Sequence, residues 1–246
     1  MLTSDIRAKT IKANPIDLWS WPQGPRRRWT GALLAQVLTA LVIPAVFWLA
    51  PLPQASAAPA LKLVVFGDSL TAGYLLPADK TFPAVLQIAL RKDGLAVSVV
   101  NAGVSGDTAS DGLTRLDWAL ADGADAVILE LGANDMLRGT DPAVTRQALE
   151  KILARLEARH IKVLIAGMRA TPSLGKDYTK AFDTIYPELA AKYRAPLYPF
   201  FLEGVATHKD LTLADGLHPN GAGVERIVNG ILPEVEAMLR AIAAKT

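Results

Sequence analysis

The segment Leu61-Lys-Leu-Val-Val-Phe-Gly-Asp-Ser-Leu70 joins a short, mostly apolar run directly to a polar turn. The run from Leu61 to Phe66 is predicted to form a strand that is covered on both faces. Asp68 and Ser69 then stand at the carboxyl end of this strand. Reactive groups in parallel sheets gather at that end, so the segment predicts both a sheet and the edge at which a site should lie.

Downstream of this segment, strand-like runs alternate with segments of helical periodicity. The further predicted strands are Ala96 to Val100, Ala126 to Leu131, Lys162 to Ala166 and Leu197 to Phe200. The predicted helices are Phe82 to Lys92, Asp111 to Ala121, Pro142 to Arg159 and Ala222 to Ala244, the last with a kink or break expected at Gly230 or Pro233. Strict alternation specifies an α/β protein with a parallel sheet of about five strands and helices on both faces.

Four polar clusters follow predicted strands or precede the last helix. They are Gly67-Asp-Ser-Leu70, Asn101-Ala-Gly-Val-Ser-Gly-Asp-Thr108, Gly132-Ala-Asn-Asp135 and Asp215-Gly-Leu-His-Pro-Asn220. Because strand ends of a parallel sheet meet at one edge, we expect these clusters to lie together.

The clusters contain the parts of an acyl-transfer site. A serine becomes a nucleophile when a histidine takes its proton and a carboxylate orients that histidine, and Ser69, His218 and Asp215 supply these groups. The three-residue spacing from Asp215 to His218 lets one loop present both side chains. The oxyanion that forms needs hydrogen-bond donors. The expected donors are the backbone N–H groups of Ser69 and Gly106 and the side-chain amide of Asn134.

Each cluster also has a purely structural interpretation. The turn at Ser69 could be an ordinary β-turn, Asn134 could cap a helix, and Asp215 could form an Asx-turn. Their occurrence together, in order and at strand ends, favours a catalytic site. The other two histidines, His160 and His208, are expected to be solvated. Neither a G-x-G-x-x-G fingerprint nor a P-loop lysine is present, which argues against a phosphate-binding site.

These motifs resemble those of the GDSL, or SGNH, hydrolases, and most closely the secreted bacterial subgroup of acyl-CoA thioesterase I, lysophospholipase L1 and arylesterase type. The resemblance covers Leu61 to Leu239 and rests on Phe66 to Tyr74, Val104 to Thr108, Glu130 to Asp135, Leu137 to Gly139 and Ala181 to Pro187. Ala133 departs from the glycine that the subgroup often has. The resemblance implies a three-layer, flavodoxin-like fold, no metal and no cofactor. It also implies that Ser69, Gly106, Asn134 and His218 are the four signature residues, with Asp215 completing the triad.

The resemblance further implies hydrolysis of small-molecule acyl esters, thioesters or lysophospholipids in a shallow pocket. Candidate substrate-binding residues are Asp68, Leu70, Ser105, Asp107, Thr108 and Met168. One alternative is a carbohydrate O-acetyl esterase with the same site, although Trp118 is the only tryptophan outside the leader. A non-catalytic binding module is a second alternative, which the intact set of site residues makes improbable.

The first 57 residues differ in composition from the rest. They carry six basic and two acidic side chains, whereas the remaining 189 residues carry 20 basic and 22 acidic ones. A nearly neutral domain lacks the basic footprint of a nucleic-acid-binding protein. The absence of cysteine excludes disulfides, thiolate zinc sites and a cysteine nucleophile.

The segment 1–57 is predicted to be an export signal. Arg26 to Arg28 precede the apolar run Gly31 to Ala50, and Ala55-Ser-Ala57 matches a signal-peptidase site. The run is also long enough for an uncleaved membrane anchor. Either way, residues 58–246 form one exported hydrolase domain, periplasmic or secreted. It is expected to be a monomer that touches the membrane only through the N-terminal segment.

Overall fold

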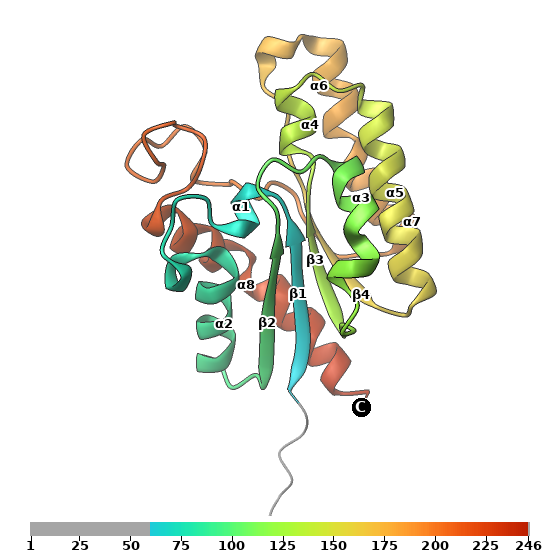
Figure 1. Cartoon of the computed structure of the whole chain (residues 1–246), viewed down its shortest axis with the longest axis vertical. Coiled ribbons are helices and arrows are strands. Elements are labelled where there is room, and N and C mark those ends of the chain that lie inside the picture. Colours follow the sequence, from blue (N-terminus) through green and yellow to red (C-terminus); the bar gives the residue numbers. More distant parts are fainter. Residues whose placement is uncertain (1–59, 246) are drawn as a thin grey trace, which may run out of the picture. The chain divides into compact units, whose positions relative to one another are not determined.

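The computed structural model describes residues 60–245, which form an α/β fold around one parallel sheet (Figure 1). The strands are β1 (Leu61–Gly67), β2 (Val97–Gly103), β3 (Ala126–Glu130), β4 (Lys162–Ala166) and β5 (Leu197–Tyr198). Their order is β2-β1-β3-β4-β5, and every neighbouring pair is parallel. The predicted five-stranded parallel sheet is therefore confirmed. The leader predicted over residues 1–57 lies outside the described residues.

Helices cover both faces of the sheet. They are α1 (Ser69–Ala72), α2 (Phe82–Lys92), α3 (Ala109–Ala119), α4 (Ala133–Leu137), α5 (Pro142–Ala158), α6 (Lys176–Asp183), α7 (Ile185–Tyr193) and α8 (Gly221–Ala243). Helices α2 and α8 pack together on one face, and α3, α5 and α7 line the other (Figure 1). None of the helices in residues 60–245 is both long and apolar enough to span a bilayer.

The last helix runs without a break through Gly230 and Pro233, so the break expected there is wrong. Gly230 lies so close to β5 that a Cβ atom there would come within 2.3 Å of the Tyr198 hydroxyl. The apolar stripe that includes Val228 and Ile231 is buried against the sheet. This burial offsets the single backbone hydrogen bond that a proline removes from a helix.

The polar clusters all emerge at the carboxyl edge of the sheet. Helix α1 begins two residues after β1 ends, and α4 begins three residues after β3 ends. The loop after β2 leads into α3. The long connection from β5 to α8 carries Asp215 and His218 back over the same edge. The topology thus brings four segments that are distant in the sequence to one place.

Candidate active site

Ser69 is the first residue of α1, in a tight turn that its neighbours dictate. The Asp68 carboxylate caps the helix by accepting a hydrogen bond of 2.9 Å from the Leu70 N–H. Gly67 is required because a Cβ atom there would lie 2.2 Å from the Thr71 hydroxyl and 2.5 Å from the Glu130 carbonyl oxygen. The short helix therefore starts at the serine, at the carboxyl edge of the sheet.

Ser69, His218 and Asp215 form a continuous chain of hydrogen bonds. Nε2 of His218 lies 2.9 Å from Oγ of Ser69, and Nδ1 lies 2.7 Å from Oδ2 of Asp215. The other oxygen of Asp215 accepts the backbone N–H groups of Leu217 and His218 at 2.9 and 3.0 Å. Asp215 is thus also an Asx-turn residue, and this structural role does not exclude the predicted catalytic one.

The same turn keeps the carboxyl group of Asp215 ionised. The hydrogen bond from the Leu217 N–H, followed by that from the His218 N–H, lowers the pKa of the Asp215 carboxyl to about 2. The carboxylate therefore stays ionised at any pH at which an esterase is normally assayed. An ionised carboxylate at Nδ1 leaves Nε2 free to take a proton from Ser69.

Tyr74 adds an aromatic contact that the sequence motifs did not single out. Its ring lies 4.6 Å from the imidazole of His218, centroid to centroid, at an interplanar angle of 38°. Tyr74 follows the glycine that ends α1, so the turn that carries Ser69 also supplies the ring that packs on His218.

The two further oxyanion candidates, Gly106 and Asn134, lie in different local settings. Gly106 has a φ of +90°, and its carbonyl oxygen accepts a hydrogen bond of 2.7 Å from Arg138. Asn134 lies inside α4, which is capped by Gly132, so the alternative of Asn134 as the cap is wrong. Its Nδ2 donates to Oδ2 of Asp68 at 3.1 Å and to the Asp107 carbonyl at 3.0 Å. Both amide hydrogens are engaged, so donation to an oxyanion requires one of them to be shared or released.

An apolar cavity of about 450 Å³ opens beside Ser69 and His218. Leu70 and Met168, two of the predicted substrate-binding residues, line it. The other large apolar side chains of its wall are Met136, Leu137, Phe200, Leu202 and Leu217. A cavity of this kind suits a hydrocarbon chain with its carbonyl carbon at the serine.

The remaining candidates for substrate binding do not line this cavity. The Asp68 carboxylate holds Asn134 and the Leu70 N–H, and the Asp107 carboxylate binds Arg115. Thr108 caps α3 through a reciprocal pair of bonds with Asp111. Ser105 is exposed on the loop before them. In the structure the carboxylates of Asp68 and Asp107 and the hydroxyl of Thr108 thus serve to hold the protein's own segments.

A buried acid, Glu130, lies directly beneath the nucleophile turn. One of its oxygens accepts the Thr71 hydroxyl at 2.8 Å and the Asp68 N–H at 3.3 Å. Its other oxygen is buried with no partner among the described residues. Burial, and then the nearby Asp68 carboxylate, raise the pKa of Glu130 well above its usual range. Burial raises the pKa of Asp68 to about 6, against the opposing hydrogen bond from Leu70. Both shifts favour the protonated forms of these two carboxyl groups.

The raised pKa of Glu130 makes stability depend on pH. A folded-state pKa above the unfolded value near 4.5 means that stability falls as the pH rises from that value toward neutrality. We expect Glu130→Gln to reduce this fall, since glutamine has no acidic proton to lose. Urea unfolding at several pH values measures the effect. The exposed Glu225→Gln should leave the pH dependence unchanged. The same pH dependence in Glu130→Gln as in the wild type would show that the pKa of Glu130 is not raised.

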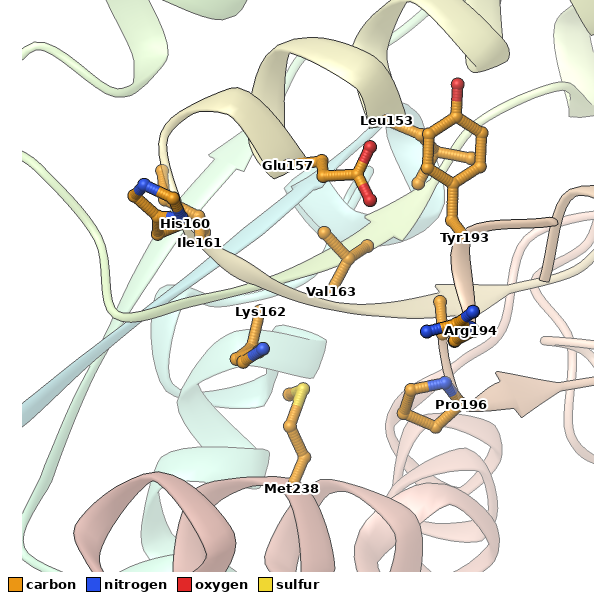
Figure 2. A pocket seen from close by; sticks show the side chains of 11 residues that line it. Leu153, Glu157, His160, Ile161, Lys162, Val163, Tyr193, Arg194, Pro196 and Met238 are labelled. Carbon is orange, nitrogen blue, oxygen red and sulfur yellow. The ribbon is translucent and has the colours of Figure 1, made fainter. Parts of the chain in front are cut away.

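A second hollow, of about 230 Å³, lies at the opposite edge of the sheet, by the amino end of β4. Figure 2 shows its side chains, among them Glu157, His160 and Lys162, which come from the end of α5 and the start of β4. Its lining contains no serine or threonine that His160 could activate as a nucleophile. No group of three or more metal-binding side chains occurs within residues 60–245.

Comparisons with known proteins identify the family of the chain. Residues 65–226 match the model of the GDSL-like Lipase/Acylhydrolase family. The chain is 43% identical to an arylesterase of Vibrio mimicus, over 64% of this chain and 80% of that protein. It is 39% identical to esterase TesA of Pseudomonas aeruginosa, over 74% of this chain and 91% of that protein. It is 42% identical to thioesterase 1/protease 1/lysophospholipase L1 of Escherichia coli, over 67% of this chain and 78% of that protein.

Solved structures show the same similarity. AlinE4, described as an esterase of the SGNH-hydrolase family, is 46% identical, with a TM-score of 0.63 over 75% of this chain and 99% of that one. The crystal structure of TesA is 38% identical, with a TM-score of 0.68 over 72% of this chain and 98% of that one.

Proposed function

The chain belongs to the GDSL-like lipase/acylhydrolase family and is a serine esterase, and from this premise we propose that it cleaves carboxylic esters and thioesters through Ser69, His218 and Asp215. The observation that carries the proposal is the bonded chain from Asp215 through His218 to Ser69, which ends at an apolar cavity of about 450 Å³.

The proposed reaction has two steps. Oγ of Ser69 attacks the acyl carbonyl carbon while Nε2 of His218 takes its proton, and the Asp215 carboxylate stabilises the imidazolium. His218 then gives the proton to the leaving alcohol or thiol, which departs and leaves an acyl-enzyme. Water, activated by the same histidine, attacks this ester and releases the carboxylic acid and Ser69.

The oxyanion formed in each step is proposed to bind the N–H groups of Ser69 and Gly106 and the amide of Asn134. We expect Asn134→Ala to lower kcat by about 10² to 10³, with little change in KM, because such a donor acts mainly on the transition state. Steady-state hydrolysis of p-nitrophenyl butyrate measures both constants. Asn229→Ala, at an exposed position of α8, is the matched control. A kcat for Asn134→Ala close to that of the wild type would remove Asn134 from the oxyanion hole.

The substrate class is proposed from the apolar wall of the cavity. Leu70, Met168 and Phe200 favour an acyl chain over a sugar ring. Trp118, the aromatic platform that a carbohydrate esterase could use, lies on α3 and is not part of the cavity wall. Rates for p-nitrophenyl esters of increasing length, acyl-CoA thioesters, a lysophospholipid and an acetylated sugar separate these classes. A preference for the acetylated sugar would favour the carbohydrate alternative.

A non-catalytic role is tested by covalent chemistry. A fluorophosphonate should label Ser69 in the wild type, because its phosphorus accepts an activated serine as a carbonyl would. Peptide mass analysis identifies the labelled residue. Lack of labelling, together with lack of turnover on every ester, would favour a binding module.

The location and assembly of the protein are also proposals. We propose that residues 1–57 direct export, that residues 58–246 act outside the cytoplasmic membrane, and that the enzyme is a monomer. The mass of the mature protein, its distribution between soluble and membrane fractions, and its sedimentation behaviour test the three statements. A mature chain that retains Gly31 to Ala50 in the membrane fraction would indicate an anchor.

A further inference from the structure

Arg115, on α3, joins three segments of the active-site edge through a single guanidinium group. Its Nη2 donates to the Gly67 carbonyl at 2.8 Å and its Nη1 to the Ala102 carbonyl at 2.9 Å. Its Nε donates to the carboxylate of Asp107. The side chain is only 16% exposed, and the guanidinium lies over the ring of Phe66 at 4.3 Å. Arg115 is thus held between the ends of two strands and a loop.

Each of the three acceptors lies beside a group that the proposed reaction uses. Gly67 ends β1, two residues before Ser69. Ala102 lies near the end of β2, directly before the loop. Asp107 follows Gly106, and its own carbonyl oxygen accepts the amide of Asn134. The guanidinium therefore fixes the spacing between the nucleophile and both further oxyanion donors.

The loop from Ser105 to Thr108 has little other support near its tip. Ser105 is exposed, and a Cβ atom on Gly106 would meet only the Arg138 guanidinium, at 3.9 Å. The tip is held by the bond from Arg138 to the Gly106 carbonyl, by Asn134 and by the ion pair between Asp107 and Arg115. Of the two arginines, Arg115 is the less exposed one, and its bond to Asp107 is charge-assisted, which makes it stronger than a bond between neutral groups.

We propose that Arg115 is a positioning residue for ester hydrolysis, which holds the loop Ser105–Thr108 in register with the turn that carries Ser69. The proposal rests on the proposed function, because it assigns oxyanion binding to Gly106 and Asn134. Arg115 does not line the substrate cavity, so it acts through these residues and not on the substrate. A lysine donates from a single nitrogen atom, so it cannot reproduce the planar arrangement of N–H groups with which the guanidinium reaches three acceptors.

The test compares Arg115→Met and Arg115→Lys with the wild type. We expect Arg115→Met to lower kcat by about 100-fold, the cost typical of a displaced oxyanion donor, with KM changed by less than about twofold. Arg115→Lys keeps a charge for Asp107 and should recover part of the loss. The rate of fluorophosphonate labelling should fall in parallel with kcat. Arg146→Met removes an exposed ion pair with Glu188 and is the matched control, expected to keep the wild-type kcat.

The outcomes separate positioning from simple stabilisation. All rates are measured per active site, well below the temperature at which circular dichroism shows each variant unfolding. A folded Arg115→Met with wild-type kcat overturns the proposal. If Arg115→Met does not fold, Arg115→Lys decides, and a wild-type kcat in this variant overturns it as well. Asn134→Ala, assayed beside them, separates the two hypotheses. Loss of rate in Asn134→Ala alone rejects only the role of Arg115, whereas wild-type rates in Asn134→Ala reject the oxyanion assignment on which the proposal rests.

Discussion

Replacing Ser69 with alanine is expected to lower kcat for p-nitrophenyl esters by about 10⁵-fold or more, as the loss of a serine nucleophile does in other hydrolases. The substitution removes one oxygen atom, the one that lies 2.9 Å from Nε2 of His218. The cap of α1 is made by Asp68 and does not involve the serine side chain, so the turn should keep its shape. Steady-state kinetics and circular dichroism measure the two effects.

A matched serine makes this test specific. Ser98 is exposed on the edge strand β2, and Ser98→Ala should keep both full turnover and fluorophosphonate labelling. Ser69→Ala should lose both while unfolding at the temperature of the wild type. Turnover retained in a folded Ser69→Ala variant would show that another group is the nucleophile.

The fold was largely predictable because its signals are local. Strands β3 and β4 are apolar runs apart from Glu130 at the end of β3 and Lys162 at the start of β4, and the amphipathic stripe of α2 gave its bounds, Phe82–Lys92, without error. Strand β2 runs on to Gly103, past the predicted Val100, because its polar residues pair with β1 up to Gly67. That pairing is a long-range contact, which periodicity along one segment cannot reveal. The family membership that the motifs indicated is confirmed.

Helices α6 and α7 were not predicted from periodicity for a different reason. They are short, of eight and nine residues, and Gly175 and Pro187 obscure where they start. Pro187 lies in the first turn of α7, where a missing N–H group costs the helix nothing. Phe182 and Tyr186 are buried, so tertiary packing rather than local propensity stabilises these helices.

The candidate site likewise contains residues that the sequence could indicate and residues that only the folded structure reveals. Ser69, His218 and Asp215 could be proposed from sequence because each follows a chemical rule about position and spacing. Glu130 gave a signal of its own, an acid that ends an apolar strand, but its pairing with Thr71 depends on the contact between β1 and β3. Arg115 gave none, since a basic residue on a helix is usually solvated. Only the folded chain shows that its guanidinium reaches three backbone segments.

Replacing His218 with alanine is expected to lower kcat by a factor comparable to that of Ser69→Ala, because the serine hydroxyl then has no base. The wild-type rate should fall on acidification, since a protonated His218 cannot take the serine proton. Asp215, with a pKa of about 2, stays ionised and adds nothing to this fall above about pH 3. Asp68, with a pKa of about 6, contributes to it, because its protonation removes the charged acceptor of Asn134.

The other two histidines of the chain provide the control for this last prediction. His160 and His208 are both exposed, and neither lines the cavity beside Ser69. His160→Ala and His208→Ala should keep the wild-type kcat and its decrease at acid pH. The residual rate of His218→Ala should lose the part of that decrease that protonation of the base causes. Measuring kcat/KM from pH 5 to 9 for all three variants decides the matter. If His218→Ala keeps a reduced but measurable rate that decreases at acid pH as in the wild type, the decrease is due to protonation of Asp68 instead. A wild-type rate in His218→Ala would mean that the hydrogen bond from Ser69 to His218 has no part in the proton transfer, and that the triad assignment is wrong.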